Sequence, residues 1–204
     1  MKMRLKNIIT ASIIAMTLMS CSGELQRADY RVIPLPKEIT ENATENPFIL
    51  SKNVVIAYPK TQPELSKEAS FLSEYLNEIL GYSLKVEEAD EVKNNAINLI
   101  VDPSSFTEND AYKIIINQEN ITVIGSNTSS VFYAIQTLRK SLPFDAEGEK
   151  INMPAGEIYD YPRFDHRGMM LDVSRHIFDL DSIKEFIDVM ALHINFFIFS
   201  LLTK

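Results

Sequence analysis

The residues best suited to chemistry lie between Tyr161 and His176, where charged side chains flank a short apolar run. Arg167 precedes the run Gly-Met-Met-Leu, and Asp172 and Arg175 follow this run. A strand inside a parallel sheet normally reads as a continuous apolar run. An unpaired charge buried there would cost about 3–5 kcal/mol. The charges therefore indicate that this buried strand leads into a site.

The motif around these residues resembles a known family. It reads Pro-Arg-Phe, two residues, Arg-Gly, then Met-Leu-Asp-Val-Ser-Arg-His, and an amphipathic stretch ending in Met-Ala-Leu-His follows. This pattern, from about Tyr159 to Asn195, is similar to the start of the catalytic barrel of glycoside hydrolase family 20, the β-N-acetylhexosaminidases. A weaker resemblance to the family's preceding α/β domain covers roughly Val32 to Pro154; at Ser130 the family more often has Gly.

The resemblance implies hydrolysis of terminal non-reducing N-acetylhexosamine residues, by a retaining mechanism in which the acetamide of the substrate is the nucleophile. It also implies an Asp-Glu pair on a later barrel strand, and no Asp-Glu dipeptide follows Arg167 here. No catalytic residue is therefore assigned in this chain, and the 204 residues alone are expected to be inactive. Amino-sugar-containing glycans are the implied partners, with no metal or organic cofactor.

Arg167 is the substrate-binding residue that the resemblance implies, because its planar fork of donors suits two neighbouring sugar oxygens. The alternative is a structural salt bridge to Asp165 or Asp172. For Asp172, Arg175 and His176 we favour supporting roles behind the substrate-binding residue. Position alone argues differently, since barrel sites gather at the C-terminal ends of strands, which favours Arg175 and its neighbour Ser174.

The elements that must position these residues follow from hydrophobic periodicity. Strands are expected at 48–50, 54–58, 96–101, 112–116 and 121–124, the last two as a hairpin. Helices are expected from Pro63 to Gly81 and from Ser126 or Asn127 to Pro143. The acidic run 87–91 is expected to be a solvated loop. Residues 32–155 are thus predicted to form an α+β domain with a mostly antiparallel sheet and two helices.

Residues 159–204 are predicted to form the first βαβ unit of a TIM (β/α)8 barrel, with strands at 164–173 and 194–201 and a helix capped by Asp181. A closed barrel takes about 250 residues, so the unit is incomplete. After His193 the family pattern breaks down, with Ile198 and Ser200 where the family has histidines. One hypothesis is a frame change or premature stop near codon 194; the alternative is a short mature protein whose apolar tail binds a partner or a membrane.

The first 20 residues are expected to be a lipoprotein signal peptide, with a basic start, an apolar run and Leu-Met-Ser before Cys21. Cys21 is the only cysteine, so it cannot form an intramolecular disulfide, and lipidation there would anchor the chain. Residues 21–31 would be a tether. We expect the protein at the cell envelope of a Gram-negative bacterium, on the periplasmic or outer side of the outer membrane.

The charge pattern excludes one class of partner. The net charge is −8, and three basic residues lie in the first six, so the remainder is more acidic still. Such a chain repels phosphate backbones, and no nucleic acid is expected. The three histidines, His166, His176 and His193, lack the spacing of a zinc site. The alternative function is a non-catalytic surface lipoprotein whose α+β domain binds glycan or a protein partner.

Overall fold

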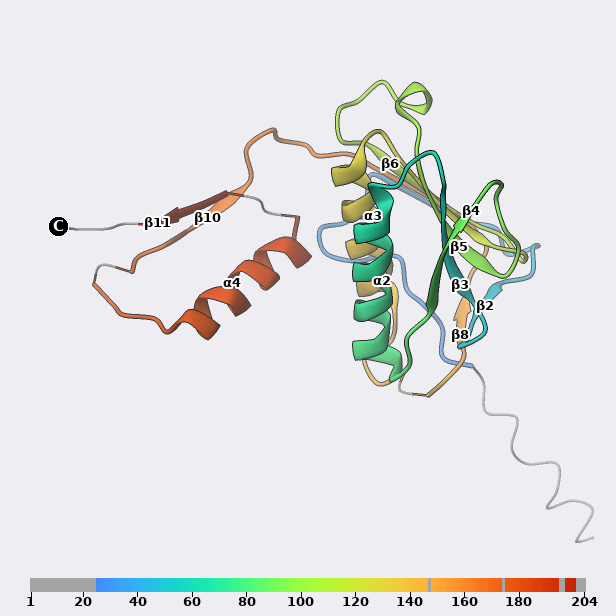
Figure 1. Cartoon of the computed structure of the whole chain (residues 1–204), viewed down its shortest axis with the longest axis horizontal. Helices are drawn as coiled ribbons and strands as arrows, with labels where there is room; N and C mark the ends of the chain where they lie inside the picture. The colour runs from blue at the N-terminus through green and yellow to red at the C-terminus, as the bar shows by residue number, and fades with distance from the viewer. Residues whose placement is uncertain (1–24, 147, 174, 195–196, 201–204) are drawn as a thin grey trace, which may run out of the picture.

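The computed structural model describes residues 25–146, 148–173, 175–194 and 197–200. A large mixed sheet carries two helices, and a small unit of two strands and one helix follows it at the C-terminal end (Figure 1). The elements are β1 Glu38–Glu41, β2 Phe48–Leu50, β3 Val55–Pro59, α2 Leu65–Leu80, β4 Lys85–Ala89, β5 Ala96–Val101, η1 Pro103–Ser105, β6 Tyr112–Ile116, β7 Ile121–Gly125, α3 Thr128–Ser141, β8 Ile151–Met153, β9 Gly156–Asp160, β10 Gly168–Leu171, α4 Leu180–Leu192 and β11 Phe197–Ser200.

The large sheet has the strand order β1-β9-β6-β7-β5-β3-β4. Its first four strands pair antiparallel, whereas β7, β5, β3 and β4 pair parallel. The prediction of a mostly antiparallel sheet was therefore wrong in this detail. The reason is that α2 forms a crossover between β3 and β4, and a helical crossover returns the chain parallel to its start. The predicted β6–β7 hairpin is confirmed.

Helices α2 and α3 lie side by side on one face of this sheet (Figure 1). Gly81 ends α2 in the left-handed conformation, with φ 72°, and its N–H donates to Asn77 O. Asn127 caps α3: its side chain accepts from Ser130 N, while the Ser130 hydroxyl accepts from Asn127 N. Both helix ends confirm the sequence prediction, and they follow from the preference of glycine for the left-handed cap and of asparagine for the N-cap.

The core lies between the sheet and these helices. Leu65, Leu72 and Leu80 of α2 are fully buried, as are Leu99 and Val123 of the sheet. The acidic run predicted as a loop is in part an edge strand, because residues 85–89 pair with β3. An edge strand tolerates charged side chains on its open side, which explains why its sequence looks like that of a loop.

Strands β10 and β11 pair in parallel across α4, which confirms the predicted βαβ connection. The observed β10 is shorter than the predicted strand 164–173. The cap of α4 is Asp179, whose Oδ1 accepts from Ser182 N at 2.7 Å, so the prediction of Asp181 as the cap was wrong. The prediction that this first strand is buried was also wrong: Met169 and Met170 are 43% and 60% exposed, because within the described residues β11 is the only strand that pairs with β10.

The predicted signal peptide and Cys21 lie outside the described residues. Among the residues that are described, no helix combines the length and the apolar character needed to cross a membrane.

Candidate functional site

A groove of about 400 Å³ lies where the large sheet meets the βαβ unit. Its walls come from both parts: β6 and α3 on one side, the segment after β9 in the middle, and the C-terminal end of α4 on the other. The lining residues are Pro34, Leu35, Tyr112, Tyr133, Asp160, Tyr161, Pro162, Arg163, Phe164, Arg167, His193 and Ile194. The groove therefore contains the arginine that the sequence singled out.

Arg167 spans this junction. Its Nε donates to Ile194 O at 2.9 Å and its Nη1 donates to Phe164 O at 2.7 Å. The guanidinium carbon lies 5.5 Å from the centre of the Tyr133 ring, on α3 of the other part. These contacts are thus with two backbone carbonyls and one aromatic ring face. In this arrangement Arg167 holds the start of β10, the end of α4 and α3 together.

Asp160 is the half-buried acid of the groove, at the last position of β9. Its Oδ1 accepts from Lys37 N at 3.2 Å, and its Oδ2 lies 3.3 Å from the Tyr112 hydroxyl. That hydroxyl also lies 2.7 Å from Thr137 Oγ1. Burial raises the pKa of Asp160 above its ordinary value, and the hydrogen bonds from Lys37, Tyr161 and Tyr112 oppose this rise. The cluster joins β9, β6 and α3 just before the chain enters the βαβ unit.

Lys140 is the partly buried base on the same side of the large sheet. Its Nζ donates to Ile33 O at 2.8 Å. Burial lowers the pKa of Lys140 to about 8, and the charge of Asp160 acts in the opposite direction. A lysine with a pKa of about 8 is still mostly protonated at neutral pH, and its hydrogen bond ties it to the N-terminal segment.

The other motif residues lie at the opposite end of β10. Arg167 directly precedes this strand, whereas Asp172 and Arg175 follow its C-terminal end. Asp172 and Arg175 form an ion pair, and Arg175 N donates to Asp172 Oδ1 at 3.2 Å. An extended strand advances about 3.3 Å per residue, so the two ends lie more than about 10 Å apart. The structure therefore does not bring Arg167 together with the other three candidates, of which His176 is exposed on the loop before α4.

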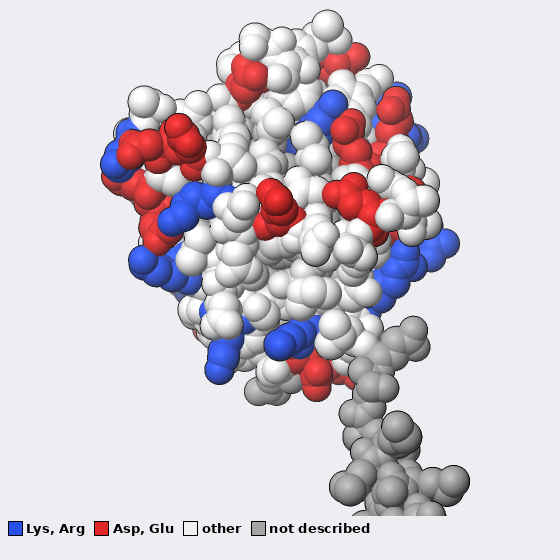
Figure 2. All heavy atoms as spheres, turned by 90° about the vertical axis from the view of Figure 1, so that its right-hand side faces the viewer, with Lys and Arg blue, Asp and Glu red and all other residues white. Residues whose placement is uncertain are grey.

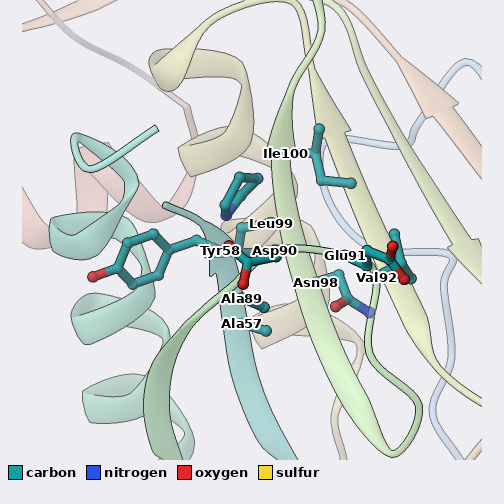
Figure 3. Close-up of a pocket in the computed structure, with 10 residues that line it drawn as sticks. Ala57, Tyr58, Ala89, Asp90, Glu91, Val92, Asn98, Leu99 and Ile100 are labelled. Atoms are coloured by element: carbon teal, nitrogen blue, oxygen red, sulfur yellow. The ribbon is translucent and has the colours of Figure 1, made fainter. Parts of the chain in front are cut away.

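A second hollow, of about 190 Å³, lies over β3, β4 and β5 and is drawn in Figure 3. It contains Asp90 and Glu91, the Asp-Glu dipeptide of the α+β domain. Asp90 pairs with Lys60 at 2.9 Å. Asn98 fixes the covering loop, because its Oδ1 accepts from Lys93 N at 2.9 Å and its Nδ2 donates to Lys93 O at 3.0 Å. Asp90 and Asn98 are thus engaged in contacts within the protein, and we assign no chemistry to this hollow.

Among the described residues, no group of three His, Cys, Asp or Glu side chains is placed to hold a metal ion. The sequence reasoning missed Asp160 and Tyr112. The available signal for Asp160 was an acid at the end of an apolar strand, directly before Tyr-Pro. No local pattern could have paired it with Tyr112, which lies 48 positions earlier in the chain.

Two sequence profiles match this chain, and together they span nearly all of the described part. The profile "Glycosyl hydrolase family 20, domain 2" matches residues 29–161, and "Glycosyl hydrolase family 20, catalytic domain" matches residues 164–201. A beta-hexosaminidase of Porphyromonas gingivalis is 32% identical over 189 residues, covering 87% of this chain and 24% of that protein. A beta-N-acetylhexosaminidase of Cellulomonas fimi is 24% identical, covering 80% of this chain and 32% of its own length. The chain thus spans about a quarter to a third of these relatives.

The fold comparison agrees with the sequence comparison. The family 20 β-N-acetylhexosaminidase of Streptomyces coelicolor superimposes with a TM-score of 0.72 at 27% identity, over 83% of this chain and 34% of that one. The β-N-acetylhexosaminidase of Bacteroides fragilis has the same fold, with a TM-score of 0.68 at 24% identity, over 86% of this chain and 34% of that one. Profile, sequence and fold lead to one conclusion: the chain belongs to glycoside hydrolase family 20.

Proposed function

We propose that this chain is the N-terminal part of an exo-β-N-acetylhexosaminidase. Such an enzyme releases terminal N-acetylhexosamine residues from glycans by the substrate-assisted retaining mechanism. The observation that carries the proposal is the family 20 match over both parts of the chain, including the motif residues of β10. We propose that the α+β domain includes β9 and ends after it, not at the predicted residue 155, because β9 pairs with β1 and β6 of the large sheet. We also assign to this domain Ala28 and Tyr30 of the predicted tether, which are buried in its core, and we propose that the catalytic barrel begins after β9. The 204 residues contain no Asp-Glu pair after Arg167, so hydrolysis would require further barrel strands.

Within that site, we propose that Arg167 contacts the sugar, as the resemblance implies. Its Nε and Nη1 donate to the backbone carbonyls of Ile194 and Phe164, which fix the position of the guanidinium. Arg175 is the alternative, because it follows the C-terminal end of β10, where barrel sites form. The two assignments predict different results for the same pair of variants.

A chimera tests the activity and the arginine together. The barrel of the Porphyromonas gingivalis relative would continue this chain after residue 194, and release of a chromogenic group from its β-N-acetylglucosaminide would be measured. We expect activity in the chimera and none in the 204-residue chain. Arg167→Ala should lower kcat/KM of the folded chimera by at least about 100-fold, as loss of a charged hydrogen bond of about 2.7 kcal/mol would. Arg175→Ala should lower kcat/KM far less.

Three other outcomes of this experiment would contradict the expected activities or the assigned arginine. Activity in the 204-residue chain would require a carboxylate elsewhere, with Asp165, Asp172 and Asp179 as the first to substitute. A folded chimera without activity would contradict the proposed reaction. A large loss of kcat/KM in Arg175→Ala at an unchanged Tm, with little loss in Arg167→Ala, would assign the sugar contact to Arg175 instead.

We also propose that Cys21 is lipidated and attaches the protein to the cell envelope, on either side of the outer membrane. What supports this is the basic and apolar leader before the single cysteine. The test is incorporation of a labelled fatty acid in a Gram-negative host. Cys21→Ser should abolish labelling and move the protein from the membrane fraction to the supernatant; equal labelling of both would contradict the proposal.

A further inference from the structure

Three aromatic side chains form a row on the large sheet, at its β9 side. The Phe106 and Tyr159 rings are nearly parallel, with centroids 6.3 Å apart and an interplanar angle of 8°. The Tyr161 ring follows at 6.0 Å from Tyr159, tilted by 56°. All three rings are partly exposed. We call Phe106, Tyr159 and Tyr161 the aromatic row.

The aromatic row begins on the face of the sheet that α2 and α3 leave open. Side chains alternate between the faces of a strand, and Ile158, which is fully buried, points from β9 toward the helices. Tyr159 therefore points away from them, in register with Lys113 on β6 and Glu38 on β1. Figure 2 shows this side of the molecule, where acidic and basic side chains are scattered over the face and a mostly uncharged stretch lies below its middle. The open face offers partly exposed rings with polar groups within reach.

The polar groups beside the row largely neutralise one another. Lys113 pairs with Glu157 at 3.0 Å, and the Tyr159 hydroxyl donates to Glu108 Oε2 at 2.6 Å. Lys37 Nζ lies 4.6 Å from the centre of the Tyr161 ring, at the far end of the row. A surface of this kind has no strong field for a polyanion or an anionic membrane. It presents carboxylate acceptors and ammonium donors next to apolar ring faces.

The loop that carries Phe106 is already held in place. Asp102 Oδ1 accepts from Ser104 N at 3.1 Å, and its Oδ2 accepts from the Ser105 hydroxyl at 2.6 Å. The bond from Tyr159 to Glu108 ties the far side of the same loop to β9. A ligand that stacks on these rings would therefore not have to order the loop first, which is the main cost in forming such a site.

We propose that the aromatic row binds a neutral oligosaccharide on the α+β domain, along the sheet face that the helices leave open, with Tyr161 at the edge of the groove that contains Arg167. A pyranose ring has an apolar C–H face that stacks on an aromatic ring, and a rim of hydroxyls that donate and accept hydrogen bonds. The rings follow one another at about the length of one sugar residue, so consecutive sugars can stack along the row while the flanking Glu and Lys side chains reach their hydroxyls. This inference does not depend on the proposed hydrolysis.

The test is titration of the full 204-residue chain with N-acetylchitotetraose by isothermal titration calorimetry. Phe106→Ala should weaken binding about tenfold, which corresponds to about 1.4 kcal/mol. Tyr159→Phe keeps the ring but loses the bond that ties the Phe106 loop to β9, so it should weaken binding less than Phe106→Ala does. Phe144→Ala is the matched control, since Phe144 is fully exposed and takes no part in the ring contacts of the row, and it should bind as the unsubstituted chain does. Thermal unfolding of each variant separates lost binding from lost fold.

Two further measurements separate this surface from the proposed barrel site and from a charge effect. Arg175→Ala should leave the affinity for the tetrasaccharide unchanged, because the row lies in the other part of the chain. A sulfated oligosaccharide of the same length should bind no more tightly. No binding at millimolar tetrasaccharide, equal affinity in Phe106→Ala, loss of binding in Arg175→Ala, or preference for the sulfated ligand would each overturn the proposal.

Discussion

The buried hydroxyl of Tyr112 holds the cluster that precedes the βαβ unit, and its removal gives the sharpest test of the structure. Tyr112 is 1% exposed, and its hydroxyl lies 2.7 Å from Thr137 Oγ1 and 3.3 Å from Asp160 Oδ2. Tyr112→Phe keeps the ring, so no large cavity forms. The variant instead leaves Thr137 and Asp160 with one partner fewer in a buried place.

The magnitude follows from the cost of unsatisfied buried groups. Leaving a buried polar partner without its hydrogen bond costs about 1–3 kcal/mol, and more where that partner is charged. We expect Tyr112→Phe to lower the free energy of unfolding by about 2 kcal/mol. For a protein of this size, about 2–4 °C of Tm corresponds to 1 kcal/mol, so the Tm should fall by about 4–8 °C.

The assay is urea unfolding followed by circular dichroism, with Tyr58→Phe as the matched control. Tyr58 is 8% exposed and points away from Asn98 in Figure 3, and its hydroxyl makes no hydrogen bond with the described residues. Tyr58→Phe should therefore change stability by less than about 0.5 kcal/mol. If both variants lose the same amount, or Tyr112→Phe loses less than about 0.5 kcal/mol, the hydroxyl does not hold the cluster and our reasoning is refuted.

Three further perturbations test the cluster, the edge strand and the close contact between β1 and β9. Burial raises the pKa of Asp160 in the folded state, so the free energy of unfolding should fall as the pH rises from the unfolded pKa through the folded one. Asp160→Asn should flatten this pH dependence in urea titrations. Asp181→Asn, at an exposed position, should leave it unchanged. Hydrogen bonds from Lys85 and then Lys93 lower the pKa of Glu87 to about 2. The contribution of Glu87 to the free energy of unfolding should therefore be complete above pH 4.5 and be lost as the pH falls toward 2. Glu87→Gln should reduce the acid sensitivity of unfolding, and an unchanged dependence of stability on acid pH would contradict the pairing. A Cβ at Gly156 would lie 2.1 Å from Thr40 O, so Gly156→Ala should lower the free energy of unfolding by about 1–3 kcal/mol by forcing β1 outward. Amide hydrogen exchange should then become faster only at residues 38–41 and 156–160, and unchanged exchange there would contradict the prediction.

Local patterns determined much of the first part of the fold. The α2 stop at Gly81, the Asn127 cap and the β6–β7 hairpin follow from residue types within a few positions of one another, and the structure agrees. The acidic strand β4 could not be recognised, because an edge strand with one open side has the composition of a loop. The parallel pairings likewise depend on where α2 packs, which no window of the sequence contains.

The motif of β10 identified the family from sequence, because the order of residue types along a strand and its flanks is a local property. Where its members lie relative to one another depends on the tertiary structure. The tertiary structure places Arg167 against the carbonyls of Phe164 and Ile194 and separates it from Asp172 and Arg175 by the length of the strand. It also assembles Asp160 with Tyr112, and Phe106 with Tyr159, from segments about 50 residues apart. Sequence alone fixes which groups are available along the chain, whereas contacts between distant groups form only when the sheet buries its apolar face and brings their strands into register.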